Sequence, residues 1–187
     1  MSLETDEVIA KRVQGGDVES FGILIERYEN KIARYARKFL LRGEDVKDIV
    51  QEVFMKAYVN IQSFDTTQRF SPWIYRIAHN EFINAIKKKE RGPLFFFDLD
   101  TILPQSVAPE TADGESQKQE MKRILDQSLD TLGALYREPL VLYYYEDKDY
   151  AEISEIMHLP IPTVSSRLRR GTAMLKKMLM ENHGADV

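Results

Sequence analysis

A stripe of amide and cationic side chains is the first group whose residue types and spacing could form a binding site. Its members recur at steps of three and four residues, which places them on one face of a helix, and we place that face opposite Trp73. They are Arg76, Asn80, Asn84, Lys87, Lys88 and Arg91. Amides can read base edges and cations can hold phosphates, so the stripe suits nucleic acid. A solvated charged face would have the same spacing.

A polar loop precedes this stripe and extends the same hypothesis. Its residues are Phe64, Asp65, Thr66, Thr67, Gln68 and Arg69. Phe64 and Phe70 flank the loop, and an unstacked base could lodge between aromatic rings so placed. The loop and the stripe together predict a surface that binds single-stranded nucleic acid.

The second group lies on two consecutive helices, predicted from Tyr150 to Met157 and from Pro162 to Met180, with a tight turn over 158–160. This is the plan of a helix-turn-helix, whose second helix enters the major groove of DNA. The predicted DNA-facing residues are Pro162, Thr163, Ser165, Ser166, Arg167, Arg169 and Arg170. The second helix has five cations and no acid. A plain helical hairpin remains the alternative.

The third group is acidic and lies on the outer face of a predicted helix that follows Glu44. It comprises Asp45, Asp48, Gln51, Glu52 and Lys56. Carboxylates at this spacing could bind magnesium in an enzyme. However, no second acidic helix, phosphate-binding glycine loop or general base accompanies them. A solvated face or a face that docks a protein partner explains the group better.

Apolar residues recur along the chain with the period of an α-helix, and the alternation typical of strands is nearly absent. We therefore predict an all-α fold, in which helices carry the three groups of residues. Thr5 is a predicted N-cap of a first helix that ends at Gln14, and a long second helix ends near Gly43. Ser71 is the predicted N-cap of the Trp73 helix, with Pro72 at its first position.

The organisation predicted is two small helical domains joined by a flexible acidic linker, with domains at 1–92 and 120–187 and the linker at 93–119. No helical period persists through the linker, where six acids between residues 98 and 120 face a single lysine. A stretch of that length without structure favours two domains. The segment Phe95–Phe97 either packs back on the first domain or contacts a partner.

Composition excludes several functional classes. The chain has 187 residues and a formal net charge of −4, which alone argues against nucleic acid, but the negative charge is concentrated in the linker. Without cysteine, disulfides and thiolate-bound metals are excluded. The histidines lack metal-ligand spacing, so we expect no metal, cofactor or catalytic residue. We expect no membrane insertion and a cytoplasmic location.

Three motifs, in order along the chain, resemble the extracytoplasmic-function sigma factors of bacterial RNA polymerase. They are DIVQEVFMKA from Asp48, FSPWIYRIAHN from Phe70 and LPIPTVSSRL from Leu159. The resemblance covers about residues 5–91 and 120–180. This sequence departs from the family pattern at Asn84, His158, Pro162 and Gly171, where aspartate, glycine, glycine and alanine respectively are common.

The resemblance implies a transcription initiation factor. The acidic helix and Phe54 would dock on the core polymerase, through Asp45, Asp48, Gln51, Glu52, Phe54 and Lys56. The loop 64–69 and the Arg76–Arg91 stripe would open and read the −10 promoter element. The helix-turn-helix would read the −35 element, and the linker would pass through the polymerase.

Three further expectations follow. The resemblance also implies an anti-sigma factor as a partner, since the family is usually regulated in this way. A stand-alone helix-turn-helix regulator is the first alternative function, and it would bind duplex DNA tightly without polymerase. A magnesium-dependent helical enzyme using Asp45, Asp48 and Glu52 is the second.

Overall fold

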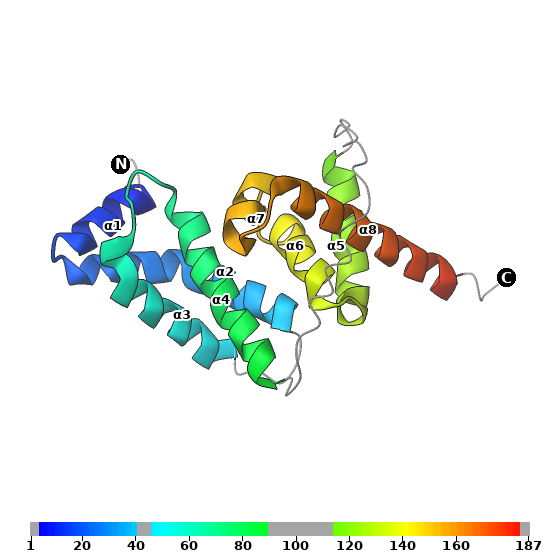
Figure 1. Cartoon of the computed structure of the whole chain (residues 1–187), viewed down its shortest axis with the longest axis horizontal. Coiled ribbons are helices and arrows are strands. Elements are labelled where there is room, and N and C mark those ends of the chain that lie inside the picture. The colour runs from blue at the N-terminus through cyan, green and yellow to red at the C-terminus, as the bar shows by residue number, and fades with distance from the viewer. Residues whose placement is uncertain (1–3, 41–45, 90–113, 184–187) are drawn as a thin grey trace. The chain divides into compact units, whose positions relative to one another are not determined.

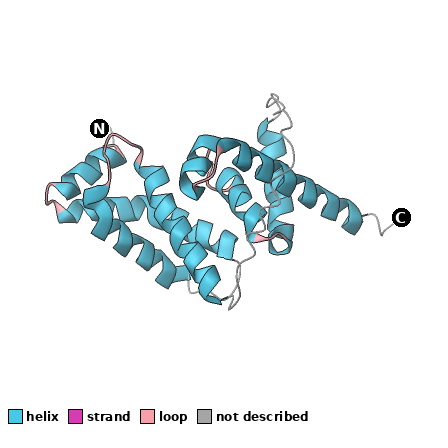
Figure 2. Ribbon diagram, in the orientation of Figure 1, coloured by secondary structure: helices cyan, strands magenta, loops and turns pink. Residues whose placement is uncertain are grey.

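The structure is a computed structural model that describes residues 4–40, 46–89 and 114–183. These ranges are helical and contain no strand (Figure 2). The elements are α1 (Asp6–Gln14), η1 (Val18–Ser20), α2 (Phe21–Leu40), α3 (Val46–Asn60), η2 (Ile61–Ser63), α4 (Phe70–Lys89), α5 (Gly114–Ser128), η3 (Leu129–Thr131), α6 (Ala134–Tyr144), α7 (Tyr150–Met157) and α8 (Ile161–His183) (Figure 1). The predicted all-α fold is confirmed. Among the described helices, none is both long and apolar enough to cross a bilayer.

The helices form two compact units. The first holds α1 to α4, and the second holds α5, α6, α8 and the greater part of α7. Within the first unit α2, α3 and α4 pack on one another, and α1 contacts both α2 and α4. Within the second unit α8 packs on α5 and α6. Two helical domains are therefore present, as the sequence predicts.

The first helix begins and ends where its sequence predicts. The Thr5 hydroxyl oxygen accepts a hydrogen bond from the Val8 N–H at 3.4 Å, which satisfies one of the unpaired donors of the first turn. The helix ends at Gln14 and is followed by Gly15 and Gly16. Gly16 has φ +101°, a conformation that glycine adopts without the strain other residues would suffer.

An aromatic cluster joins α2 to α4 in the core of the first unit. The ring centroid of Tyr35 lies 4.8 Å from that of Phe82 and 5.7 Å from that of Tyr75. All three side chains are fully buried. The burial of Tyr75 was not predicted, because tyrosine is found at half-exposed positions as often as at buried ones. This cluster determines which side of α4 faces inward.

The start of α4 differs from the prediction. Ser71 is not the N-cap, because the helix already begins at Phe70, two residues before the predicted first position at Pro72. The Phe70 N–H donates to the Glu7 carboxylate at 2.9 Å, so a side chain distant in sequence satisfies the first turn. Pro72 lies within that turn, where a missing N–H costs no helical hydrogen bond.

Helix α5 begins at Gly114, so residues 114–119, which the sequence analysis assigned to the linker, are helical. The stretch Glu115–Glu120 contains no proline, and its glutamate, glutamine and lysine residues are good helix formers. The rest of the predicted linker, including Phe95–Phe97, lies outside the described residues.

Gly171 permits close packing between α8 and α6. A Cβ atom at this position would lie 2.8 Å from Leu140 Cδ1 and 3.3 Å from Tyr136 Cβ. Leu140 is fully buried, so its side chain would have to shift within the packed core, and the Tyr136 Cβ atom is held close to the backbone. The glycine that looks unfavourable inside a helix is therefore required by the helix crossing.

We expect Gly171→Ala to destabilise the second unit. Overpacking of this kind costs about 1–3 kcal/mol, against a gain of about 1 kcal/mol in helix propensity. Urea unfolding followed by far-UV circular dichroism measures the change. Fluorescence of Trp73, the single tryptophan, reports on the first unit and should keep its midpoint.

Gly22→Ala is the matched control. Gly22 is an exposed helical glycine in α2, and a Cβ there would meet no atom within 4 Å. It should be neutral or stabilise the first unit by up to about 1 kcal/mol. An equal stabilisation by Gly171→Ala would contradict the packing account.

Candidate nucleic-acid interface and docking surface

The polar stripe of α4 lies on the outward side of the helix. Asn80, Asn84, Lys87 and Lys88 are exposed and Arg76 is half-buried, while Phe82 on the opposite side is fully buried. Arg91 lies outside the described residues. The stripe therefore presents two amides and three cations to solvent, in the order the sequence analysis predicted.

The predicted relation of the stripe to Trp73 is wrong. Arg76 and Asn80 follow Trp73 by three and seven residues on one continuous helix, so all three share a face. Trp73 is half-buried because its ring packs 5.1 Å from the ring of Phe64 and 5.4 Å from that of Phe70. The indole thus forms the boundary between the loop 64–69 and the stripe.

The two phenylalanines at the ends of the loop are not presented to a ligand. Phe64 is 5% exposed and Phe70 is fully buried, and their ring centroids lie 5.4 Å apart, edge to face. Tyr28 of α2 extends the group at 5.5 Å from Phe70. A base cannot enter between rings that already contact each other, so Phe64 anchors the loop in this conformation.

The middle of the loop carries its exposed polar side chains. Asp65 accepts hydrogen bonds from the backbone N–H of Thr67 at 3.0 Å and from its hydroxyl at 2.8 Å. These two hydrogen bonds, the backbone one first, lower the pKa of the Asp65 carboxyl below its usual value. Thr67, Gln68 and Arg69 are exposed and Thr66 is half-buried. The loop is an ordered turn whose tip offers hydroxyl, amide and guanidinium groups.

Sequence reasoning missed two side chains of α1 that hold this loop. The Gln14 amide donates to the carbonyl oxygens of Ile61 at 2.7 Å and Phe64 at 2.8 Å. At the other end of the loop Glu7 accepts from the Phe70 N–H. No local signal marks either residue, since their partners lie 47 to 63 positions away.

The predicted docking residues of α3 face several directions. Asp48 and Gln51 are exposed, Phe54 is 6% exposed, and Glu52 is half-buried. Asp45 lies outside the described residues. Lys56 forms an ion pair with Glu81 of α4 at 2.7 Å and a longer one with Glu52 at 3.7 Å. The hydrogen bond to Glu81 is the main cause of the raised pKa of Lys56.

Exposed apolar side chains on α3 were not predicted. Met55, Tyr58 and Val59 are 59%, 40% and 76% exposed. Met55 and Tyr58 line a groove of about 850 Å³ between α2 and α3, together with Phe21, Ile25, Glu29, Asn30, Ala33, Arg37, Val46, Lys47, Val50, Gln51 and Phe54. An apolar floor with a polar rim is typical of a protein-binding surface. The sequence signal was present, because the apolar residues of α3 exceed one stripe.

The helix-turn-helix forms as predicted, with α7 and α8 joined by a tight turn. Asp149 and Glu152 form a capping box at the start of α7. The Asp149 carboxylate accepts from the Glu152 N–H at 2.8 Å, and the Glu152 carboxylate accepts from the Asp149 N–H at 3.0 Å. His158 ends α7 in the left-handed conformation, φ 53° and ψ 45°. The Ser154 hydroxyl donates to the Leu159 carbonyl oxygen and closes the turn. His158 thus occupies a conformation that glycine adopts most easily.

Most predicted base-reading residues of α8 lie on its accessible side. Pro162 and Arg169 are exposed, and Thr163, Ser165, Ser166 and Arg170 are half-buried. Arg167 differs from the expectation, since it is 8% exposed. Leu168 and Val164, one and three positions away, are buried too, so the inward side of α8 is wider than a single stripe. Arg167 cannot reach a base edge from this position without a change of rotamer.

Within the described ranges no cluster of histidine, cysteine, aspartate or glutamate could hold a metal ion. Asp48 and Glu52, two of the three carboxylates of the magnesium alternative, lie there without a further acidic partner to complete such a site. The geometry therefore offers surfaces for macromolecules, and it gives the magnesium alternative no support.

Comparison with known proteins identifies the family of the chain. Family models for sigma-70 region 2 and sigma-70 region 4 match residues 24–92 and 122–175. The ECF RNA polymerase sigma factor SigW of Bacillus subtilis (strain 168) is 34% identical over 182 residues, covering 91% of this chain and 95% of the relative. The ECF RNA polymerase sigma-E factor of Escherichia coli (strain K12) is 34% identical, covering 89% and 90%.

Two solved structures share the fold. CnrH, in complex with the cytosolic domain of CnrY, matches with a TM-score of 0.70 at 23% identity, over 98% of this chain and all of that one. The sigma factor RpoE of Bartonella quintana, in complex with the anti-sigma factor NepR, matches with 0.64 at 24% identity, over 86% and 97%. Similarity to curated relatives over nearly the whole length shows that this chain belongs to the extracytoplasmic-function sigma factors of RNA polymerase.

Proposed function

We propose that this chain binds core RNA polymerase through its first unit and directs it to promoters that both units read. It acts as an initiation factor without catalytic chemistry of its own, in the cytoplasm with the polymerase. The observation that carries the proposal is the presence of two outward polar surfaces, on α4 and α8, in a chain related over 91% of its length to an ECF sigma factor.

The α2–α3 groove is the proposed docking surface for the polymerase. Its apolar floor and polar rim suit an amphipathic helix, which lays its apolar face into such a groove. Gln51 and Phe54 line it, and Asp48 and Asp45 precede them on the same segment. The largest subunit of the polymerase offers such helices in its clamp. The apolar Met55 and Tyr58 would supply most of the affinity, because exposed apolar area is what association buries.

The loop 64–69 and the α4 stripe are proposed to capture the melted −10 element. Flipping a base out of the stack costs a few kcal/mol, which contacts with the captured strand must offset. Thr67, Gln68 and Arg69 would contact the flipped base at the loop tip. Asn80, Asn84, Lys87 and Lys88 would hold the strand that follows, with Arg76 on the same side. Arg91, which lies outside the described residues, is proposed to join them.

The second unit is proposed to read the −35 element with α8 in the major groove. Its hydroxyl groups and guanidinium groups are donors suited to base edges and phosphates. Thr163, Ser165, Ser166, Arg169 and Arg170 lie on the accessible side with Pro162, and Arg167 would join them only on turning outward. The acidic segment around 93–119 would connect the two readers.

An anti-sigma factor is the proposed regulator. Of the two structural neighbours, RpoE is in complex with the anti-sigma factor NepR, and CnrH is in complex with the cytosolic domain of CnrY. The apolar groove and the α8 surface are the two faces that an inhibitor would need to cover, since each is required for a different step of initiation.

The central test is reconstitution. Core polymerase with this protein should yield transcripts from a promoter library, and the selected promoters should share −10 and −35 motifs. Core polymerase alone should not. Absence of any promoter-dependent transcript would overturn the proposal. A gel shift with and without core polymerase tests the alternative, because a stand-alone regulator would bind duplex DNA equally tightly in both.

Met55→Asp should weaken binding to core polymerase by about tenfold or more, because a charge replaces apolar area at the groove. Val18→Asp is the matched control: Val18 is 54% exposed in the same unit and does not line the groove. Fluorescence anisotropy of labelled protein titrated with core polymerase measures both. Equal loss in both variants would show that the groove is not the docking surface.

Arg169→Ala should weaken holoenzyme binding to the promoter by about five- to a hundredfold, the loss of one base-directed guanidinium. The loss should disappear on a promoter whose −35 element is scrambled. Lys177→Ala removes the same charge from α8 two turns further on and should cost less. If both variants lose affinity equally on both promoters, Arg169 acts only through charge.

A further inference from the structure

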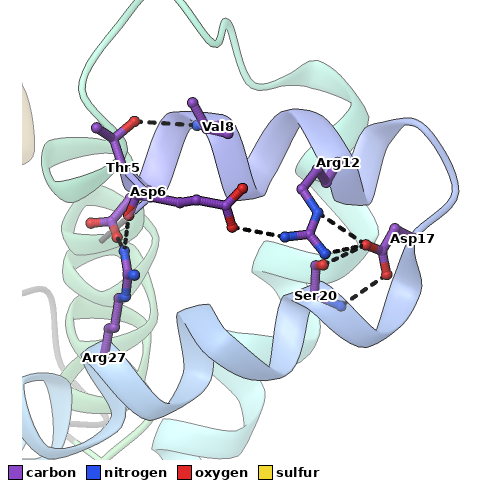
Figure 3. Close-up of polar contacts among 8 residues, drawn as sticks. Thr5, Asp6, Val8, Arg12, Asp17, Ser20 and Arg27 are labelled. Carbon is purple, nitrogen blue, oxygen red and sulfur yellow. Dashed lines mark hydrogen bonds and ion pairs between the residues drawn. The ribbon is translucent and has the colours of Figure 1, made fainter. Parts of the chain in front are cut away.

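Helix α1 is fixed at its start to α2 and at its end to Asp17, the N-cap of η1 (Figure 3). At its start the Asp6 carboxylate accepts hydrogen bonds from Arg27 at 2.6 Å and from the Tyr28 hydroxyl at 2.6 Å. Burial, and secondly this bond to Asp6, raise the pKa of Tyr28, so its hydroxyl remains a donor. At its end Arg12 pairs with Asp17 at 2.7 Å. The helix is therefore a rigid part of the first unit.

From this fixed position α1 holds both ends of the loop 64–69. Gln14 uses its two amide hydrogens on two carbonyl oxygens, those of Ile61 and Phe64. Its backbone carbonyl accepts from the Gln62 amide at 3.2 Å. Glu7 accepts the Phe70 N–H. The loop is thus attached to α1 immediately before its first exposed residue and immediately after its last.

The spacing of the two side chains suits this task. Glu7 and Gln14 lie seven residues apart, which is almost two full turns, so both project from the same side of α1. A rise of 1.5 Å per residue separates them by about 10 Å along the axis. Two contacts at that separation fix both the position and the direction of a short loop, which one contact could not do.

The core-facing side of α1 is next to the side that carries the two loop contacts. Ile9, Ala10 and Val13 are buried in the core of the unit. Lys11 and Arg12 are exposed on the solvent side. Helix α1 therefore presents three faces, of which one packs, one is solvated and one carries the two polar contacts to the loop.

We propose that α1 is a positioning element for −10 recognition, with Glu7 and Gln14 as its two positioning residues. It holds the loop in the conformation that receives an unpaired base, so that the entropy of ordering the loop is lost on folding and not on DNA binding. This inference rests on the proposed function. Both residues precede residue 24, where the match to region 2 begins, so the family match does not assign them a role.

Variants of Glu7 and Gln14, two of them isosteric, separate an effect on loop position from an effect on folding. Gln14→Glu keeps the shape of the side chain but replaces the amide nitrogen, with both of its donor hydrogens, by a carboxylate oxygen that faces two carbonyls. Glu7→Ala removes the acceptor of the Phe70 N–H, whereas Glu7→Gln keeps an oxygen that can accept it. Lys11→Ala alters an exposed residue that lies one turn from Glu7 and from Gln14, and it is the matched control.

The experiment measures two steps of initiation with the reconstituted holoenzyme. Assembly with core polymerase is titrated by anisotropy, and promoter opening is followed by the fluorescence of 2-aminopurine in the non-template strand of the −10 element. Gln14→Glu should slow opening by about tenfold and Glu7→Ala by about fivefold, as expected for the loss of one or two hydrogen bonds. Assembly should stay within twofold. Glu7→Gln and Lys11→Ala should open promoters at the wild-type rate.

Hydrogen exchange on the free protein checks the contact without polymerase. The Phe70 amide should be protected in the wild type and in Glu7→Gln, and it should exchange faster in Glu7→Ala. An unprotected Phe70 amide in the wild type would overturn the inference. So would variants that lose assembly and opening in equal measure, or that lose neither. A wild-type holoenzyme that opens no promoter would contradict the proposed function itself.

Discussion

Burial of the aromatic cluster between α2 and α4 is the constraint on which the first unit depends. Tyr35, Tyr75 and Phe82 exclude water completely, so α4 has one permitted rotation about its axis. That rotation turns Asn80 and Lys87 outward and leaves Trp73 at the edge of the loop. The outward polar surface, which is the proposed DNA-binding surface, is thus specified by apolar packing on the opposite side of the helix.

Local signals in the sequence predicted the helices, the Thr5 cap, the tight turn at His158 and the outward stripe of α4. Each depends on residues within about one or two helical turns. What failed depended on tertiary contacts: the start of α4 on Glu7, 63 positions away, and the burial of Phe64 on its packing against Phe70 and Trp73. The inward position of Arg167 is a third failure. Periodicity identifies a buried face but not its width, and the width decides whether a residue at the margin can reach a ligand.

The placement of Trp73 shows how a small error in face changes a mechanism. Opposite the stripe, the indole would be only a core residue. On the same face, it forms one wall of the recognition surface and stiffens the loop through its ring contacts with Phe64 and Phe70. In a similar way the Lys56–Glu81 ion pair joins α3, the proposed docking helix, to α4, the proposed DNA-binding helix. The Lys56–Glu81 ion pair is invisible in the sequence because its residues belong to separate helices. The ring contacts of Trp73 span only three and nine positions.

The turn residue His158 has a consequence for the stability of the second unit. A left-handed conformation costs a non-glycine residue about 1–2 kcal/mol, and the second unit is small enough for that to be a large share of its stability. Each kcal/mol raises the unfolded population about fivefold, and proteases degrade proteins from that population. A histidine at this position therefore makes the second unit less stable than a glycine would, so the turn that closes the helix-turn-helix also sets a limit on its folding stability.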